Sequence, residues 1–164
     1  MKYVTLNNTD IKVSRIALGT DVYGATLDEE KSFAMLDFYI GKGGTVIDTA
    51  AGYSDWIEGE KSRSEKLIGR WLDGKKRDSI VISTKGAFPY PETPNISRLS
   101  AEEIRADLEG SLKRLKTDYI DIYWLHRDDI NKPVGEIMET LHSFVKEGKT
   151  RYIGMSNWTH ERIE

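Results

Sequence analysis

The sequence predicts an α/β fold of the TIM (β/α)8-barrel type, in which five βα units follow a leading β-hairpin. First, short β-prone apolar runs alternate with amphipathic helical patterns, and such alternation implies parallel strands joined by right-handed crossovers. Second, the first strand-to-helix turn lacks a G-x-G-x-x-G fingerprint, which disfavours the competing architecture, an open doubly wound sheet that binds dinucleotides. Third, three strands are followed by polar side chains that a barrel would gather on one face.

The length and composition of the chain narrow the classes to which it can belong. Its 164 residues suggest one domain over residues 1–164, whereas a complete barrel runs to about 250 residues, so only part of a barrel is expected. The net charge of −3 gives no sign of nucleic-acid binding, and the absence of cysteine excludes disulfides and thiolate metal sites. There is no apolar leader and no run near the roughly 18 apolar residues of a membrane span. We therefore expect a cytoplasmic protein without a membrane partner.

The N-terminal part of the chain predicts a hairpin, a strand and a helix. A turn cluster at residues 7–10 separates two short alternating runs, which indicates a hairpin over residues 3–13. The first core strand is expected near residues 15–19. A capping box at residues 26–29 then opens a helix that ends at Gly41.

The middle of the chain continues the alternation. Strands are expected near residues 45–49 and 79–84, because both are β-prone apolar runs bounded by turn residues. The serine-rich turn at residues 62–65 is interpreted as the cap of the helix between them. The loop at residues 86–99 holds three of the four prolines, and a further capping box at residues 100–103 opens the next helix.

The last part of the chain predicts two more strands and the helix between them. The strands are expected near residues 119–125 and 151–156. Pro133 suits the first turn of the intervening helix, and Gly148 ends it. Another helix is expected to begin near Thr159.

Four residues at the strand exits are candidates for catalysis. Asp48 leaves the strand at residues 45–49, Lys85 ends the next strand, and His126 follows the strand after that, while Tyr53 lies on the first of these loops. Because an unpaired buried charge is costly, we expect Asp48 and Lys85 to form an ion pair.

Each of these residues also has a structural explanation when it is taken singly. Asp48 could cap a loop and Tyr53 could be a packed aromatic side chain. Lys85 could be a solvated strand end and His126 a structural histidine. Their joint occurrence at three strand ends and one loop favours a functional site.

Several motifs resemble those of the aldo-keto reductase family, and together they span essentially the whole chain. They are Leu18-Gly19-Thr20, Ile47-Asp48-Thr49-Ala50 with Tyr53, Ser64-Glu65, Ser83-Thr84-Lys85, Leu112-Lys113-Arg114-Leu115 before Asp118-Tyr119-Ile120-Asp121, Leu125-His126, Glu147-Gly148-Lys149 and Ile153-Gly154-Met155-Ser156-Asn157. The resemblance implies a TIM barrel and the NAD(P)H-dependent reduction of aldehydes or ketones to alcohols.

The resemblance also implies which residues form the site. The family's catalytic tetrad falls on Asp48, Tyr53, Lys85 and His126. The implied cofactor contacts are Gly19, Thr20, Asp48, Ser156 and Asn157, the last two of which would contact the nicotinamide carboxamide. We expect NADP(H) in preference to NAD(H), no metal ion, and a small-molecule carbonyl compound as the substrate.

The chemistry explains these residue types. Reduction of a carbonyl group needs a hydride at carbon, which a nicotinamide supplies, and a proton at oxygen, which the phenol of Tyr53 would supply. The ammonium group of Lys85 would stabilise the phenolate, and Asp48 would keep Lys85 charged and oriented. His126 would position the carbonyl oxygen.

Loop aromatic residues are candidates for the substrate pocket, namely Tyr23, Trp56 and Phe88. Two features depart from the family's pattern and bear on the class of substrate: the charged insertion at residues 54–63, and Arg127 directly after His126.

A second hypothesis is a catalytically silent or regulatory module of the same fold, or a half-barrel without activity of its own. The four candidate catalytic residues favour an enzyme, whereas the missing strands favour the second hypothesis for this polypeptide. If the chain is truncated, its first and fifth core strands would be open sheet edges, through which we expect self-association.

Overall fold

The computed structural model describes residues 1–164 and contains a sheet of five parallel strands that lie side by side in chain order. The strands are β3 (Ala17–Gly19), β4 (Val46–Asp48), β5 (Val81–Gly86), β6 (Ile120–Leu125) and β7 (Thr150–Met155). In a doubly wound sheet the strand order reverses at one point. Here the order does not reverse, which is the arrangement of consecutive strands in a barrel. The predicted strand ranges differ from these bounds by no more than two residues at either end.

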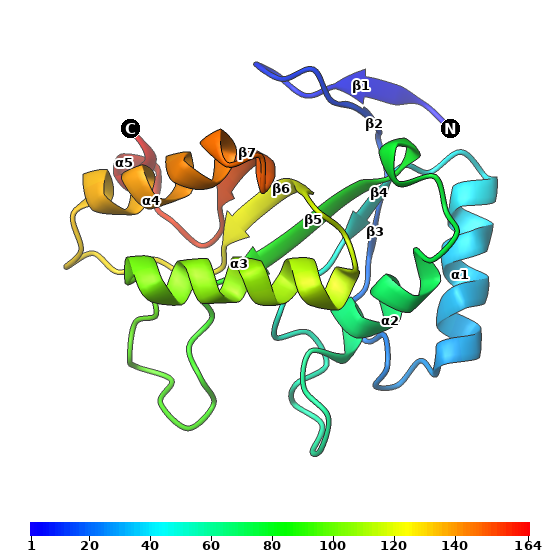
Figure 1. Ribbon diagram of the computed structural model, residues 1–164, viewed down its shortest axis with the longest axis horizontal. Helices are drawn as coiled ribbons and strands as arrows, with labels where there is room; N and C mark the ends of the chain where they lie inside the picture. Colours follow the sequence, from blue (N-terminus) through cyan, green and yellow to red (C-terminus); the bar gives the residue numbers. More distant parts are fainter.

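Helices alternate with the strands and cover one face of the sheet. They are α1 (Glu29–Gly41), α2 (Arg63–Trp71), α3 (Ala101–Leu115), α4 (Val134–Lys146) and α5 (His160–Ile163), with a 3-10 helix η1 (Arg77–Ser79) before β5. In Figure 1, α1 to α4 follow one another around the outside of the sheet. None of the helices combines the length and the apolar character that a membrane span requires.

The main hydrophobic core lies between this outer face of the sheet and the helices. Its buried side chains include Ile47, Ile82, Tyr123 and Leu125 on the strands and Leu36, Leu67, Leu108 and Phe144 on the helices. Successive side chains of a strand point to opposite faces, so the residues between them face the other way.

The strand register gathers polar side chains on the inner face of the sheet. Asp48 lies opposite Ser83, and Lys85 lies opposite Trp124, which in turn lies opposite Gly154. Residues that are opposite one another in a parallel pair share a face, and so do residues two apart in one strand. The inner face therefore carries these polar side chains near the carboxyl ends of the strands.

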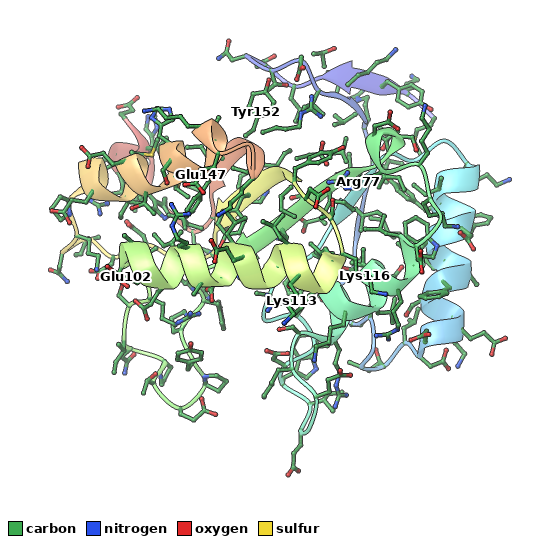
Figure 2. All side chains as sticks on the ribbon, in the orientation of Figure 1. Arg77, Glu102, Lys113, Lys116, Glu147 and Tyr152 are labelled. Atoms are coloured by element: carbon green, nitrogen blue, oxygen red, sulfur yellow. The ribbon has the colours of Figure 1, made fainter.

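The predicted hairpin is present as β1 (Tyr3–Thr5) paired antiparallel with β2 (Lys12–Ser14). The backbone N–H of Ser14 donates to the hydroxyl of Thr45, just before β4, at 2.8 Å. At the other side, the hydroxyl of Tyr152 near the start of β7 donates to Asp10 in the turn of the hairpin. Figure 2 labels Tyr152, which lies close to the hairpin. The hairpin thus lies at the amino ends of the strands, and Figure 1 shows the long loops projecting from the opposite end.

Two of the helix caps test the sequence interpretation. The capping box of α3 is confirmed, because Ser100 accepts from the backbone N–H of Glu103 and the Glu103 carboxylate accepts from the backbone N–H of Ser100. For α1, the predicted box beginning at Thr26 is wrong: Asp28 is the N-cap and accepts from the backbone N–H of Lys31 at 2.9 Å.

The predicted cap of α2 at residues 62–65 is also wrong. Ser62 has a left-handed backbone conformation, with a φ of 55°, and its side chain makes no capping hydrogen bond. Ser64 and Glu65 are fully buried and reach neighbouring elements instead. Ser64 and Glu65, which the sequence placed in a local helix cap, therefore make long-range contacts near the ends of the strands instead.

Candidate active site

Asp48 and Lys85 meet at the carboxyl ends of neighbouring strands, because β4 ends at Asp48 and Lys85 is the penultimate residue of β5. The Nζ atom of Lys85 lies 2.7 Å from Oδ2 of Asp48. Both side chains are mostly buried: 12% of the Lys85 side chain and 31% of the Asp48 side chain is exposed. The predicted ion pair is therefore confirmed.

The ammonium group of Lys85 also bonds to Tyr53. It donates to Asp48 Oδ2 at 2.7 Å, to the carbonyl oxygen of Thr49 at 3.0 Å and to the phenolic oxygen of Tyr53 at 3.1 Å. A lysine ammonium has three N–H donors and no acceptor, so all three are used and the last bond runs from Lys85 to Tyr53. The O–H proton of Tyr53 is consequently free to point at another acceptor.

The backbone beyond β4 brings Tyr53 back over Lys85. The ladder continues past the end of the strand, since the N–H of Ala51 donates to the carbonyl oxygen of Lys85 at 3.0 Å. A turn follows, in which the N–H of Tyr53 donates to the carbonyl oxygen of Ala50 at 3.2 Å. The phenol is thus fixed by backbone bonds on a loop that is anchored to β5.

His126 continues β6 at the same end of the sheet, and its N–H donates to the carbonyl oxygen of Gly86 at 2.9 Å. Its ring lies edge-on to Tyr53, with 6.1 Å between the ring centroids, and 4.8 Å from the ring centroid of Phe88. The Nδ1 atom is buried and has no hydrogen-bond partner. His126 therefore lies beside Tyr53, as the sequence predicted, and between two aromatic rings.

The environment of His126 lowers its pKa. Burial, followed by the positive charges of Lys85 and Arg127, lowers the pKa of His126 from 6.5 to about 4, although the charge of Asp48 acts in the opposite direction. The imidazole is accordingly neutral at neutral pH and carries a single N–H.

A layer of buried polar side chains supports the backbone at the strand ends. The hydroxyl of Thr20 donates to the carbonyl oxygen of Asp48 at 2.9 Å, and Ser64 bonds to both Thr20 and Thr49 at 2.9 Å. Sequence reasoning missed this layer, because Ser64 lies within the run of residues 62–65 that was interpreted as a helix cap.

A chain of two hydrogen bonds ends at Oδ1, the oxygen of Asp48 that Lys85 does not contact. The hydroxyl of Ser83 donates to Asp48 Oδ1 at 2.8 Å, and the indole N–H of Trp124 donates to Ser83 at 2.7 Å. Sequence reasoning also missed these two residues. Strand alternation was the available signal, because Ser83 is two residues before Lys85 and Trp124 is two residues before His126.

Most of the residues predicted to contact a cofactor lie around this end of the sheet. Gly19 ends β3 opposite Asp48, and no atom lies within 4 Å of the position that a Cβ would take there. Ser156 and Asn157 follow β7 directly. Thr20 differs from these residues, since its side chain is fully buried and bonded to the protein backbone.

The polar groups of Ser156 and Asn157 fit a primary carboxamide, such as that of nicotinamide. The side-chain N–H groups of Asn157 donate to the carbonyl oxygen of His126 at 2.8 Å and to the hydroxyl of Ser156 at 3.1 Å. The amide oxygen of Asn157 and the hydroxyl proton of Ser156 have no partner within the protein. These two residues therefore offer one acceptor and one donor side by side.

The three aromatic residues predicted to contact substrate occupy different surroundings. Tyr23 differs from the expectation, because it is only 3% exposed, belongs to the main core, and has its pKa raised to about 12 by burial. Trp56 is 61% exposed on the charged loop. Only Phe88, which is 38% exposed, packs against a residue of the predicted tetrad, His126, with the two rings tilted by 49°.

Comparison with known proteins identifies relatives of this chain. Residues 15–164 match the model of the "Aldo/keto reductase family". The chain is 39% identical over 164 residues to the uncharacterized oxidoreductase YrpG of Bacillus subtilis (strain 168), covering 96% of this chain and 50% of YrpG. It is 34% identical over 146 residues to the aryl-alcohol dehydrogenase [NADP(+)] of Phanerodontia chrysosporium, covering 82% of this chain and 36% of that enzyme.

A solved structure shows the same arrangement of elements. The holo form of the aldo-keto reductase AKR11C1 from Bacillus halodurans superposes with a TM-score of 0.81 at 30% sequence identity, covering 96% of this chain and 50% of the other. The five parallel strands and their helices thus correspond to part of a TIM barrel. The chain spans about half the length of YrpG, the relative with which it shares 39% identity.

Proposed function

Because the chain belongs to the aldo-keto reductase family of oxidoreductases, we propose that it carries the catalytic residues of an enzyme that reduces aldehydes or ketones to alcohols with a nicotinamide dinucleotide. One observation carries the proposal: Lys85 donates to Tyr53 and not the reverse, so the phenolic proton is available to a substrate. In the proposed reaction, Tyr53 gives that proton to the carbonyl oxygen.

The charges around Tyr53 suit this proton transfer. As the O–H bond breaks, the phenolic oxygen becomes negative, and the ammonium group of Lys85 is already 3.1 Å away. Asp48 keeps the ammonium group charged and fixes its position through the hydrogen bond of 2.7 Å. When it is bound, the reduced dinucleotide supplies the hydride that the carbonyl carbon receives.

His126 orients the carbonyl group in this proposal. A neutral imidazole with its proton on Nε2 offers one N–H to the same carbonyl oxygen that Tyr53 protonates. The low pKa of His126 supports this role, because a neutral ring does not compete with Tyr53 as an acid. The proposal assigns no role to a metal ion.

The proposed cofactor contacts follow from the free polar groups at this end of the sheet. Ser156 and Asn157 bind the carboxamide of the nicotinamide, and Gly19 leaves room beside Asp48. We propose NADP(H) in preference to NAD(H), and the name of the aryl-alcohol dehydrogenase relative supports this choice. The hydroxyl of Thr20 acts through the backbone of Asp48 and not by contact with the cofactor.

The exposed face of Phe88 beside His126 supports an apolar or aromatic small-molecule carbonyl substrate. The relatives named as aryl-alcohol dehydrogenase and norsolorinic acid reductase point to the same class. Aromatic aldehydes are therefore the first substrates to test.

An activity assay with a matched pair of variants tests the proposal. Purified protein is mixed with 4-nitrobenzaldehyde and either NADPH or NADH, and both dinucleotide oxidation and alcohol formation are measured. We expect one alcohol for each NADPH oxidised, and loss of turnover in Lys85→Met. Lys75→Met is the control, because it also removes a lysine–aspartate pair of 2.7 Å, between Lys75 and Asp37 on the outer surface. Absence of turnover across a panel of aldehydes and ketones would instead favour a catalytically silent module.

A further inference from the structure

We infer that Ser83 and Trp124 are positioning residues for the proposed reaction, which they serve by fixing the carboxylate of Asp48. The inference rests on the proposed function, but it concerns two residues outside the predicted tetrad: Ser83 bonds to Oδ1 of Asp48, the oxygen that Lys85 does not contact, and Trp124 bonds to Ser83. Neither of them contacts Lys85 or Tyr53 by a hydrogen bond.

The bonds form a chain with one direction. An indole N–H can only donate and an ionised carboxylate can only accept, whereas a serine hydroxyl does both. The chain therefore runs from Trp124 to Ser83 and from Ser83 to Asp48, with distances of 2.7 Å and 2.8 Å. On the other side, Lys85 donates to both Asp48 and Tyr53.

This chain determines the orientation of the Asp48 carboxylate. Oδ1 accepts from Ser83 and Oδ2 accepts from Lys85, so each oxygen has its own donor. Without the bond to Ser83, the carboxylate could rotate about its terminal torsion, which is broad in aspartate. Rotation would move Oδ2 relative to Lys85 and, through Lys85, disturb the hydrogen bond to Tyr53.

The strands provide a defined place for the indole ring. Trp124 lies between Lys85 and Gly154 in the register of the sheet. A Cβ atom at residue 154 would lie 2.3 Å from Cε3 of Trp124, so only glycine leaves room for the ring in this position. Ser83 is only 4% exposed, so water does not readily replace its hydrogen bonds.

A purely structural explanation is that Trp124 fills space on the inner face and that its hydrogen bond is incidental. The two explanations differ in their consequences. If Trp124 only fills space, removing the indole N–H changes stability and leaves kcat unchanged. If Trp124 positions Asp48 through Ser83, the change appears in kcat.

Kinetics of four variants separate these explanations. Ser83→Ala and Trp124→Phe each remove one bond of the chain, and we expect kcat to fall on the order of tenfold with KM nearly unchanged. The double variant should fall no further than the larger single effect, because either change interrupts the same chain. Ser83→Thr keeps the hydroxyl and should restore most of the loss.

The controls are Ser111→Ala and Trp71→Phe. Ser111 is another fully buried serine, and Trp71 donates its indole N–H to Asp37 at 2.9 Å on the outer side of the sheet. We expect both controls to retain kcat. Unchanged kcat in Ser83→Ala and Trp124→Phe, in protein whose Tyr53→Phe variant is inactive, would overturn the positioning role and leave the proposed function standing.

A spectroscopic measurement tests the chain without turnover. The four tryptophans give four indole N–H signals in a 15N-correlated NMR spectrum. We expect Ser83→Ala to shift the Trp124 signal, and Asp48→Asn to shift it as well because Ser83 loses its charged acceptor. The Trp71 signal should stay in place in both variants. If the Trp124 signal did not respond to either substitution, the inference would fail, whether or not the protein proves to be a reductase.

Discussion

Lys85 is the most constrained residue of the site, since its three N–H donors meet three acceptors on the segment that begins at the end of β4, residues 48–53. Asp48 and Tyr53 accept through their side chains, and Thr49 accepts through its backbone. An ammonium group can direct its three N–H bonds to such converging acceptors, whereas a guanidinium group is a planar fork.

Lys85→Arg should therefore be nearly as damaging as loss of the charge. We expect kcat for an aromatic aldehyde to fall by about 10²-fold or more, because the planar group cannot reach Asp48 and Tyr53 in the present arrangement. Steady-state kinetics measure this, with Lys75→Arg at the surface as the control. Retention of more than about half of the kcat would show that charge alone suffices at this position.

The pKa of His126 gives a second prediction. The folded protein keeps this imidazole neutral down to a pH of about 4, whereas an unfolded chain protonates it near its ordinary value of 6.5. The unfolded state therefore binds more protons between these two values, so this residue lowers the free energy of unfolding as the pH falls through that window.

An NMR titration of the histidine ring signals measures the pKa of His126 directly, and the spectrum of His126→Gln assigns its signal among the three histidines. We expect a midpoint of about 4. A midpoint at the ordinary value of 6.5 would mean that the ring is exposed to water and that Phe88 does not cover it.

Sequence reasoning found the residues that end strands but not those that support them. Asp48 and Lys85 were predictable, because a charge at the exit of a buried strand requires a partner. Glu65 was not, because its pattern with Ser62 is the same whether the side chain caps a helix or crosses to Thr84. The burial of His126 was also unpredictable, since it depends on how the loop after β5 folds back over the ring.

At the scale of elements, α2 and α3 begin in different ways although both follow a serine. Ser100 accepts from the N–H of Glu103 in a complete capping box, whereas the side chain of Ser62 makes no capping bond. The start of α2 is stabilised by tertiary contacts from Ser64 and Glu65 instead. Helix starts that depend on such contacts cannot be recognised from local sequence.

This contrast predicts different effects of the same substitution. Ser100→Ala should lower the free energy of unfolding by about 1 kcal/mol, the usual cost of a lost N-cap. Ser62→Ala should change it by about 0.5 kcal/mol or less, because no side-chain bond is lost. Urea denaturation of the two variants measures both values, and an equal loss in both would contradict the assignment of the caps.

At the scale of the whole molecule, one end of the sheet is covered and the other carries the site. The hairpin places Ile11 and Val13 against Val46 and Val81 at the amino ends of the strands. The strand order is predictable, because strand-like apolar runs alternate with helical patterns along the sequence. The curvature of the sheet does not, because it depends on the side chains that pack on both of its faces.

The hairpin should contribute measurably to stability. Ile11 is 3% exposed, so Ile11→Ala should lower the free energy of unfolding by about 2–5 kcal/mol. Ile16→Ala is the control, because Ile16 is 63% exposed and should lose about 0.5 kcal/mol or less. If both variants unfolded at the same urea concentration as the parent protein, the hairpin would not be part of the cooperative unit.

The edges of the sheet are a further property of the whole chain. β3 and β7 each pair with a strand on one side only. Self-association through these edges stays a prediction, as does the assignment of residues 1–164 to a single domain.

The measurement that tests the central claim most directly is the kcat of Tyr53→Phe with an aromatic aldehyde. This substitution keeps the ring beside His126 and removes only the hydroxyl that accepts from Lys85. The proposal predicts that kcat falls by at least about 10²-fold, while the dissociation constant of the dinucleotide changes little. A variant that turned over aldehyde at the rate of the parent protein would contradict the claim that Tyr53 is the proton donor.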